Sequence, residues 1–237
     1  MPRIWTGTSG FNYPEWKGRF YPDDLPASGM LPFYASRFET VEINYSFYRM
    51  PSEKLLAGWA AQVGGAFTFS LKAPRRITHD RRLKDCADPL QAFCRVTATL
   101  GERLGVLLFQ LPPNFKCDLD RFDAFLGELP PRVRAAFEFR HDSWHDEPVY
   151  ERLRGRNLAL CVADSPDRRT PLVATADYGY LRLRDEGYDT GQLKGWATEV
   201  GAQKWREAFV YFKHEDEGRG PDFAAAFMRQ LGRPAGG

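Results

Sequence analysis

A glutamate and an arginine stand two residues apart in a short apolar run, residues 135–140, before the chain enters a polar segment. If this run is a β-strand, Glu138 and Arg140 point to one face, while Phe137 and Phe139 point to the other. Two charged groups in apolar surroundings are costly unless they pair with each other or face a polar cavity. The spacing therefore predicts either an internal ion pair or a polar site at the end of this strand.

Polar side chains recur at the ends of eight segments that are rich in β-branched and aromatic residues and are predicted to be strands. The predicted strands cover residues 3–9, 40–45, 66–72, 105–110, 135–140, 158–164, 178–184 and 209–214. The polar residues near their carboxyl ends are Ser9, Glu42, Asn44, Lys72, Gln110, Glu138, Arg140, Asp164, Arg182, Arg184, Lys213 and His214. Because every predicted strand contributes, we expect these side chains to converge on one site.

Helical patterns separate the predicted strands, over residues 31–38, 52–60, 88–100, 120–126, 148–154, 195–207 and 221–231, and the segment after the sixth strand is the least regular. This alternation is typical of parallel strands joined by crossover helices. Eight such units in 237 residues predict an α/β protein with a (β/α)8 TIM-type barrel, formed by residues 1–237 as one domain. An open doubly wound sheet is the alternative, but the turn at residues 7–12 lacks the dinucleotide-binding glycine pattern.

Three carboxylates at the strand ends are the candidate catalytic residues. We expect Glu138 to be the main general acid or base, supported by Glu42 and Asp164. These carboxylates are also possible ligands for one divalent metal ion. The alternative is that they only neutralise neighbouring cations. Because histidines are few and the four cysteines lack the Cys-x-x-Cys spacing, we predict no tightly bound metal and no cofactor.

Basic side chains are concentrated at the same predicted end of the barrel. Lys72, Arg140 and Arg182 come from strands, and the segment after the third strand adds Arg75 and Arg76 together with Arg81, Arg82 and Lys84. Guanidinium groups suit phosphate or carboxylate, so we expect an anionic ligand. A solvated charged loop is the alternative for the segment after the third strand. Lys72 could instead form a Schiff base, although an ion-paired or phosphate-binding lysine is the preferred interpretation.

The segment after the first strand mixes aromatic and basic residues, among them Tyr13 and Trp16. Such a mixture can stack on nucleic-acid bases, or it can be a lid whose rings pack onto the barrel. Both interpretations place the segment over the site. Asn44, Gln110 and His214 complete the predicted set of substrate-binding residues.

Composition narrows the class of protein. A net charge of +2 does not by itself indicate a nucleic-acid or membrane partner, and 43% hydrophobic residues are ample for a core. We recognise no leader and no apolar run of membrane-spanning length, so we expect a soluble, cytoplasmic protein with reduced cysteines.

Several long motifs occur in a fixed order: GTSGFNYPEWKGRFYP, VEINYSFYRMP, FTFSLKAPRRITH, LLFQLPPNF, FEFRHDSW and YLRLRDEGYDTGQLKGWA. With these motifs the chain resembles the YecE-like family, also called domain of unknown function 72, over nearly its whole length. The resemblance implies a TIM-type barrel, which agrees with the alternation of strands and helices. It implies no particular reaction.

The sequence thus predicts a hydrolase or lyase whose pocket binds a phosphate-bearing small molecule or a nucleic acid. The alternative is a non-catalytic nucleic-acid or ligand-binding module, in which the same cations hold a partner and no bond is broken.

Overall fold

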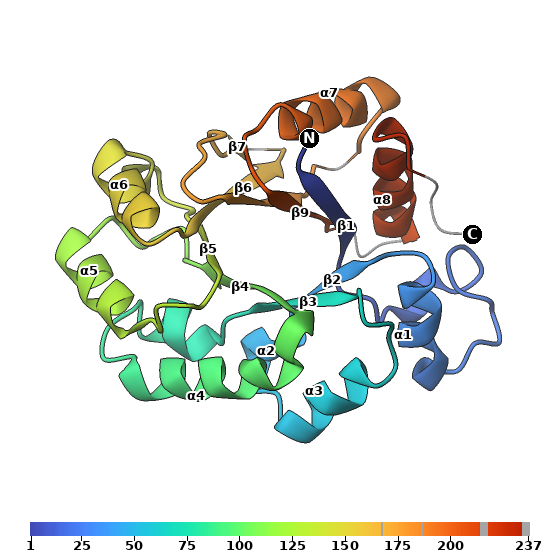
Figure 1. Ribbon diagram of the computed structural model, residues 1–237, viewed down its shortest axis with the longest axis horizontal. Coiled ribbons are helices and arrows are strands. Elements are labelled where there is room, and N and C mark those ends of the chain that lie inside the picture. The colour runs from blue at the N-terminus through green and yellow to red at the C-terminus, as the bar shows by residue number, and fades with distance from the viewer. Residues whose placement is uncertain (167, 186, 214–217, 234–237) are drawn as a thin grey trace.

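The computed structural model describes residues 1–166, 168–185, 187–213 and 218–233 of the chain. Eight parallel strands form its centre (Figure 1): β1 (Arg3–Ser9), β2 (Thr40–Ile43), β3 (Thr68–Lys72), β4 (Leu104–Gln110), β5 (Ala135–Glu138), β6 (Ala159–Ser165), β8 (Tyr178–Leu183) and β9 (Glu207–Phe212). Pairing of β1 with β9 and of β5 with β6 closes the sheet. The predicted (β/α)8 TIM-type barrel is confirmed.

Helices surround the barrel, as Figure 1 shows. They are α1 (Ala27–Ala35), α2 (Tyr45–Tyr48), α3 (Glu53–Ala60), α4 (Ala87–Thr97), α5 (Leu119–Glu128), α6 (Glu147–Gly155), α7 (Thr190–Gly201) and α8 (Arg219–Gln230). Short helical turns are η1 (Pro14–Trp16), η2 (Arg76–Asp80), η3 (Ala98–Arg103) and η4 (Asp142–Trp144). None of the described helices is both long and apolar enough to cross a membrane.

The segment between β6 and β8 departs from the strand-and-helix alternation. Its described residues contain the two-residue strand β7 (Arg168–Arg169), which pairs antiparallel with β6, and no helix. The helical pattern was least regular here, and backbone bonds to β6 take the place of a packed helix.

Local sequence signals explain where several helices begin. The side chain of Ser52 accepts a hydrogen bond from the Leu55 amide at the start of α3, and Asp118 accepts one from the Arg121 amide at the start of α5. Asp189 and Gln192 form a reciprocal capping box at the start of α7. These contacts satisfy amide groups that have no partner within the helix.

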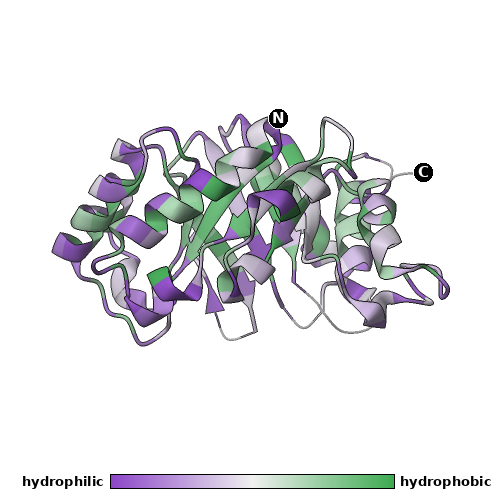
Figure 2. Cartoon of the chain, turned by 90° about the horizontal axis from the view of Figure 1, so that it is seen from below, coloured by the Kyte–Doolittle hydropathy of each residue, from purple (hydrophilic) through white to green (hydrophobic). Residues whose placement is uncertain are grey.

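Two apolar layers lie on the two faces of the barrel wall. The larger layer lies between the strands and the helices, and the smaller one fills the barrel interior with side chains such as Trp5, Leu108, Tyr180 and Tyr211. Figure 2 shows the hydrophobic colouring on the strands and more hydrophilic colouring on the surrounding helices. Residues two apart on a strand share a face. On β8 this rule places Tyr178, Tyr180 and Arg182 inside, with the arginine at the carboxyl end.

Gly7 on β1 lies against the neighbouring strand so closely that a Cβ atom there would be 2.0 Å from the carbonyl oxygen of Thr40. We expect Gly7→Ala to lower the free energy of unfolding by at least about 2 kcal/mol, because the backbone of β2 must move. Gly58→Ala is the matched control, since Gly58 lies in α3 with open space around it. It should raise stability by about 0.5–1 kcal/mol. Urea unfolding measures both changes, and equal stability of Gly7→Ala and the unchanged protein would contradict the close approach.

Candidate functional site

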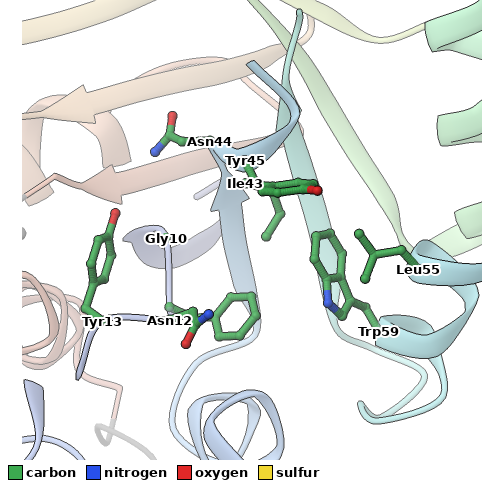
Figure 3. A pocket seen from close by; sticks show the side chains of 9 residues that line it. Gly10, Asn12, Tyr13, Ile43, Asn44, Tyr45, Leu55 and Trp59 are labelled. Carbon is green, nitrogen blue, oxygen red and sulfur yellow. The ribbon is translucent and has the colours of Figure 1, made fainter. Parts of the chain in front are cut away.

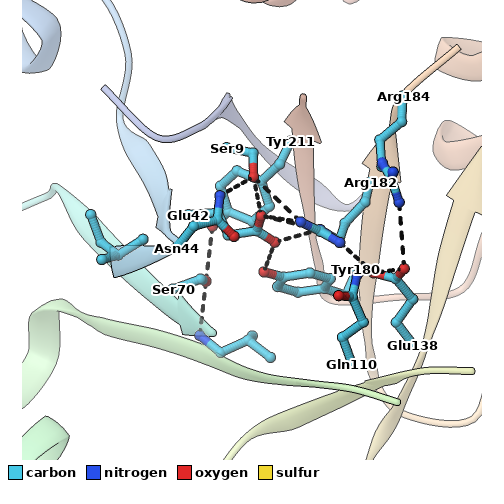
Figure 4. Close-up of polar contacts among 12 residues, drawn as sticks. Ser9, Glu42, Asn44, Ser70, Gln110, Glu138, Tyr180, Arg182, Arg184 and Tyr211 are labelled. Atoms are coloured by element: carbon cyan, nitrogen blue, oxygen red, sulfur yellow. Dashed lines mark hydrogen bonds and ion pairs between the residues drawn. The ribbon is translucent and has the colours of Figure 1, made fainter. Parts of the chain in front are cut away.

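The guanidinium of Arg182 lies between two carboxylates inside the barrel (Figure 4). Its Nε is 2.9 Å from Oε2 of Glu42, its Nη2 is 2.9 Å from Oε1 of Glu42, and its Nη1 donates to Oε2 of Glu138. All three side chains are buried, with at most 1% of each exposed. Glu138 also pairs with Arg140, as one of the two interpretations of their spacing predicted, and the whole network is larger than that local pattern showed.

Neighbouring polar groups occupy the remaining positions around Glu42. Tyr180 donates to Oε2 of Glu42 at 2.6 Å, and the hydroxyl of Ser9 donates to Oε1. Asn44 in turn donates to Ser9 at 2.7 Å. A buried carboxylate is stable only when its oxygens are matched by such donors.

Glu138 is held in the same way from the opposite side. Gln110 donates to its Oε1 at 2.7 Å, Arg140 Nε lies at 3.0 Å from the same oxygen, and Arg184 Nη1 lies at 3.7 Å. Both carboxylate oxygens of Glu138 thus contact donors on other residues.

Burial alone would raise the pKa of Glu138, but the charges of Arg182, Arg140 and Arg184 together lower that pKa well below its ordinary value. Glu138 therefore stays ionised at neutral pH and has no proton to donate. This geometry favours the alternative in which Glu138 and Glu42 are counter-ions of the arginines over the acid–base role that we expected.

Above this network lies a cavity of about 470 Å³ at the carboxyl ends of the strands. It is lined by Phe47, Tyr48, Lys72, Arg75, His79, Gln110, Arg140, Arg182, Arg184 and Lys213. We call it the basic cavity. Among the described residues no carboxylate lines it, so cationic groups dominate the surface that a ligand would meet.

Lys72 is the last residue of β3 and reaches into the basic cavity. Its Nζ lies 3.9 Å from the ring centroid of Phe47, and none of the described carboxylates lies within ion-pair distance of it. Burial, followed by the charge of Arg182, lowers the pKa of Lys72 to about 7, although Glu138 and Glu42 oppose the change. Lys72 therefore exchanges its proton near neutral pH.

The aromatic residues of α2 are site residues that our reasoning from the sequence missed. Phe47 and Tyr48 line the basic cavity, and the rings of Phe47 and His79 make a T-shaped contact with centroids 4.9 Å apart. Burial and the charges of Lys72 and Arg140 lower the pKa of His79 to about 4, so this imidazole is neutral at pH 7. The signal for these residues was their position, because α2 directly follows the polar end of β2.

Asp164 does not share the basic cavity, so this part of the predicted convergence was wrong. In the sheet it pairs with Leu183, which belongs to the helix-facing layer, whereas Ala163 pairs with Arg182. Asp164 accepts hydrogen bonds from Tyr188 at 2.9 Å and from Trp196 at 3.3 Å. Because successive residues of a strand point to opposite faces, Asp164 points outward, into a separate hollow of about 230 Å³ next to α7.

The aromatic segment after β1 packs onto the barrel. Trp16 is 1% exposed, and its ring contacts Tyr13 with centroids 4.8 Å apart. This burial favours the lid interpretation for Trp16, because a buried ring offers no face to a base. Tyr13 and Asn44 line a second cavity of about 510 Å³, which Figure 3 shows and which is mainly apolar, with Phe11 and Trp59 among its walls.

The remaining predicted residues fall beside the basic cavity or outside the described chain. Arg76 lines a neighbouring hollow of about 540 Å³, which Arg75 shares with the basic cavity. His214 lies outside the described residues. Within the described ranges no group of three or more His, Cys, Asp or Glu side chains is arranged to hold a metal ion.

Fold and site together define a TIM-type barrel protein with a cationic cavity at the carboxyl end of its strands. The model of the family described as "Protein of unknown function DUF72" matches residues 5–236, and the chain belongs to this family. The predicted resemblance is confirmed.

The chain is similar to two curated relatives. It is 26% identical to the UPF0759 protein YunF of Bacillus subtilis over 236 residues, covering 90% of this chain and 79% of the relative. It is 28% identical to the UPF0759 protein YecE of Escherichia coli K12 over 156 residues, covering 65% of this chain and 55% of the relative.

Solved structures of the family have the same fold. A DUF72 family protein of Thermotoga maritima superposes with a TM-score of 0.83 at 27% identity, covering 98% of this chain and 100% of that protein. One of Enterococcus faecalis superposes with a TM-score of 0.78 at 19% identity, covering 98% of both chains.

Glu138→Gln should lower the free energy of unfolding by about 3–5 kcal/mol at pH 7, because it leaves the buried charge of Arg182 with one partner fewer. The pKa of Glu138 in the folded protein lies below its ordinary value of 4.5. The stability that ionised Glu138 contributes is therefore complete above pH 4.5 and is lost as the pH falls below 4.5. Denaturant unfolding of both proteins from pH 7 to pH 3 should show the difference shrinking. Glu199→Gln, at an exposed ion pair with Arg169, is the control and should cost at most about 1 kcal/mol. An equally small cost for Glu138→Gln would contradict the buried network.

Lys72→Met should stabilise the protein by about 3 kcal/mol at pH 6, because it removes a partly buried ammonium that has no described counter-ion. The pKa of Lys72 is about 7 in the folded protein, below its ordinary value of 10.5. Between these pH values the unfolded chain holds the proton and the folded protein does not, so the free energy of unfolding of the unchanged protein rises with pH. The advantage of Lys72→Met should therefore shrink from pH 7 to pH 10 in parallel urea titrations. Exposed Lys194→Met should show no such trend. A constant difference across the range would mean that Lys72 keeps an ordinary pKa.

Proposed function

We propose that this protein binds a phosphate-bearing small molecule in the basic cavity and acts on it as a lyase. The observation that carries the proposal is the charge around one cavity. Four lining arginines, Arg75, Arg140, Arg182 and Arg184, share three described carboxylates, Glu42, Glu138 and Asp80, and Lys72 adds a fifth cation that pairs with none of them. With Lys72 protonated, these five cations and three carboxylates leave two positive charges for a ligand.

The donors that remain fit a phosphate group. Arg140 contacts Glu138 through Nε, and this leaves its two Nη groups, on a side chain that is 32% exposed, for a ligand. A guanidinium fork binds two oxygens of a phosphate at once. Field lines from several cations also concentrate in a cleft with low-dielectric walls. A volume of about 470 Å³ is in the range of small-molecule sites.

The reaction class follows from which groups can move a proton. Hydrolysis by a pair of carboxylates needs one acid that is protonated and one base that is accessible. Glu42 and Glu138 are both buried and fully engaged with donors. Lys72 is the lining group whose pKa, about 7, suits proton transfer or nucleophilic attack. These observations support a lyase more than a hydrolase.

A second candidate function is binding of single-stranded nucleic acid, which one observation favours. Tyr48 is 81% exposed at the border between the basic cavity and the neighbouring hollow that contains Arg75, Arg76 and Arg81. An exposed ring next to guanidinium groups suits a base stacked beside its phosphates.

Binding of inorganic phosphate and of a short single-stranded oligonucleotide, each titrated calorimetrically at several sodium chloride concentrations, tests the two candidates. For the small-molecule function, phosphate binds with a shallow salt dependence, and Arg140→Ala weakens it at least tenfold because a charged donor pair is lost. Arg206→Ala removes a cation at the amino-terminal side of β9, next to Asp177, and should change nothing.

For the nucleic-acid function, affinity for the oligonucleotide falls steeply with salt, and neutralising Arg75 and Arg76 reduces the slope by about one unit for each lost phosphate contact. If neither phosphate nor the oligonucleotide binds at millimolar concentration, both candidate functions are contradicted. The cations would then serve only to neutralise Glu42 and Glu138.

A further inference from the structure

We infer that Lys72 is a nucleophile that forms an imine with the carbonyl carbon of a phosphorylated aldehyde or ketone held in the basic cavity. This inference rests on the proposed phosphate-binding function and names the substrate class and the reacting atom. It assigns Phe47 to shield one side of the amine and Arg140 to hold the phosphate end of the substrate.

The backbone holds Lys72 firmly at the rim of the barrel. Ser46 donates its hydroxyl hydrogen to the Lys72 carbonyl oxygen at 2.7 Å, and Lys72 is in register with Leu108 on β4. The next residue, Ala73, donates its amide to the Leu108 carbonyl at 2.8 Å. With the backbone fixed at the strand end and Nζ resting on the Phe47 ring, the amine is positioned for attack on a bound carbonyl.

The surroundings of the amine differ from those of an ordinary surface lysine. Phe47 covers one side of Nζ at 3.9 Å, and Arg182, Arg140, Arg75 and Arg184 line the same cavity. Contact of a cation with a ring face stabilises the charged form too weakly to offset burial beside several other cations.

Only the neutral amine has the lone pair that attacks a carbonyl. With a pKa of about 7, roughly half of Lys72 is neutral at pH 7. A lysine with the ordinary pKa of 10.5 is neutral in roughly one molecule in three thousand at that pH. The exposed lysines Lys54, Lys116 and Lys194 serve as the comparison within the same chain.

The covalent step is balanced without any other reactant. The lone pair of neutral Nζ forms a carbon–nitrogen bond while the carbonyl π bond breaks, which gives a carbinolamine. The carbon–oxygen bond then breaks and the carbon–nitrogen double bond forms. The oxygen leaves as water, and the amine loses the two hydrogens that this water carries. One amine and one carbonyl thus give one imine and one water, and nothing is oxidised or reduced.

The competing role for Lys72 is that of an ammonium that contacts the phosphate. That role needs a protonated nitrogen and leaves no covalent product. It also predicts that phosphate binding weakens as the pH rises through 7, whereas imine formation requires the deprotonated form. The two roles therefore depend on pH in opposite directions.

Pyridoxal 5′-phosphate is a suitable probe, because it carries an aldehyde and a phosphate on one small molecule. We expect borohydride reduction of the mixture at pH 7.5 to fix one phosphopyridoxyl group per chain, located at Lys72 by peptide mass mapping. Labelling at Lys54, Lys116 and Lys194 together should be less than one tenth of this. The rate of labelling should rise with pH with a midpoint near 7, the pKa of Lys72.

Variants separate the roles of the amine and the phosphate-binding residues. Lys72→Arg should abolish the label and Lys72→Met should do the same, while a thermal melt confirms that each variant folds. Arg140→Ala should reduce labelling at least tenfold, and so should competing inorganic phosphate or the use of pyridoxal without its phosphate. Exposed Lys194→Arg should leave the label unchanged.

The outcomes distinguish this inference from the proposed function. If phosphate binds and Arg140→Ala weakens it, yet no adduct forms at Lys72, the imine is wrong and the anion site stands. If neither phosphate binding nor an adduct is detected, both are wrong. A label spread evenly over the exposed lysines would also overturn the inference.

Discussion

The burial of Arg182 between two carboxylates is the constraint on which the carboxyl end of this barrel depends. Glu42, Glu138 and Arg182 come from β2, β5 and β8, which lie apart around the closed sheet, so the contacts cross the interior. Each charge would cost several kcal/mol without its partners, and each partner is held by further donors. The network therefore fixes the positions of three strand ends and closes the polar end of the barrel.

The same network decides which groups remain for chemistry. It uses both acids at the centre of the barrel, and it leaves the cationic rim only partly neutralised. Carboxylates that looked catalytic by their position become the counter-ions of a structural arginine. Lys72, which lines the basic cavity at the side of the network and lacks a described counter-ion, is instead a group that can change its protonation near pH 7.

Reasoning from the sequence placed the barrel, its strands and most of the cavity correctly, because alternation of strand and helix and polarity at strand ends are properties of local sequence. Lys72, Gln110, Arg140 and Arg182 are brought together as expected. Asp164 was expected inside the barrel but points outward, because a shift of one residue along a strand moves a side chain to the other face of the sheet. Whether Glu138 is a base or a counter-ion depends on contacts with β4 and β8, which no local pattern contains.

The arrangement around Lys72 also constrains how a bound anion would affect it. A phosphate that neutralises Arg140 removes part of the positive field, and this loss alone would raise the pKa of Lys72. Burial, however, is the largest cause of its lowered pKa, and a ligand that fills the cavity excludes more water and strengthens that effect. The two changes oppose each other at the same amine. On the proposed function, a phosphorylated ligand that also covers Nζ with its carbon skeleton would keep more of the amine neutral than free phosphate does. The same cavity would then favour imine chemistry with such a ligand and ionic contact with a bare anion.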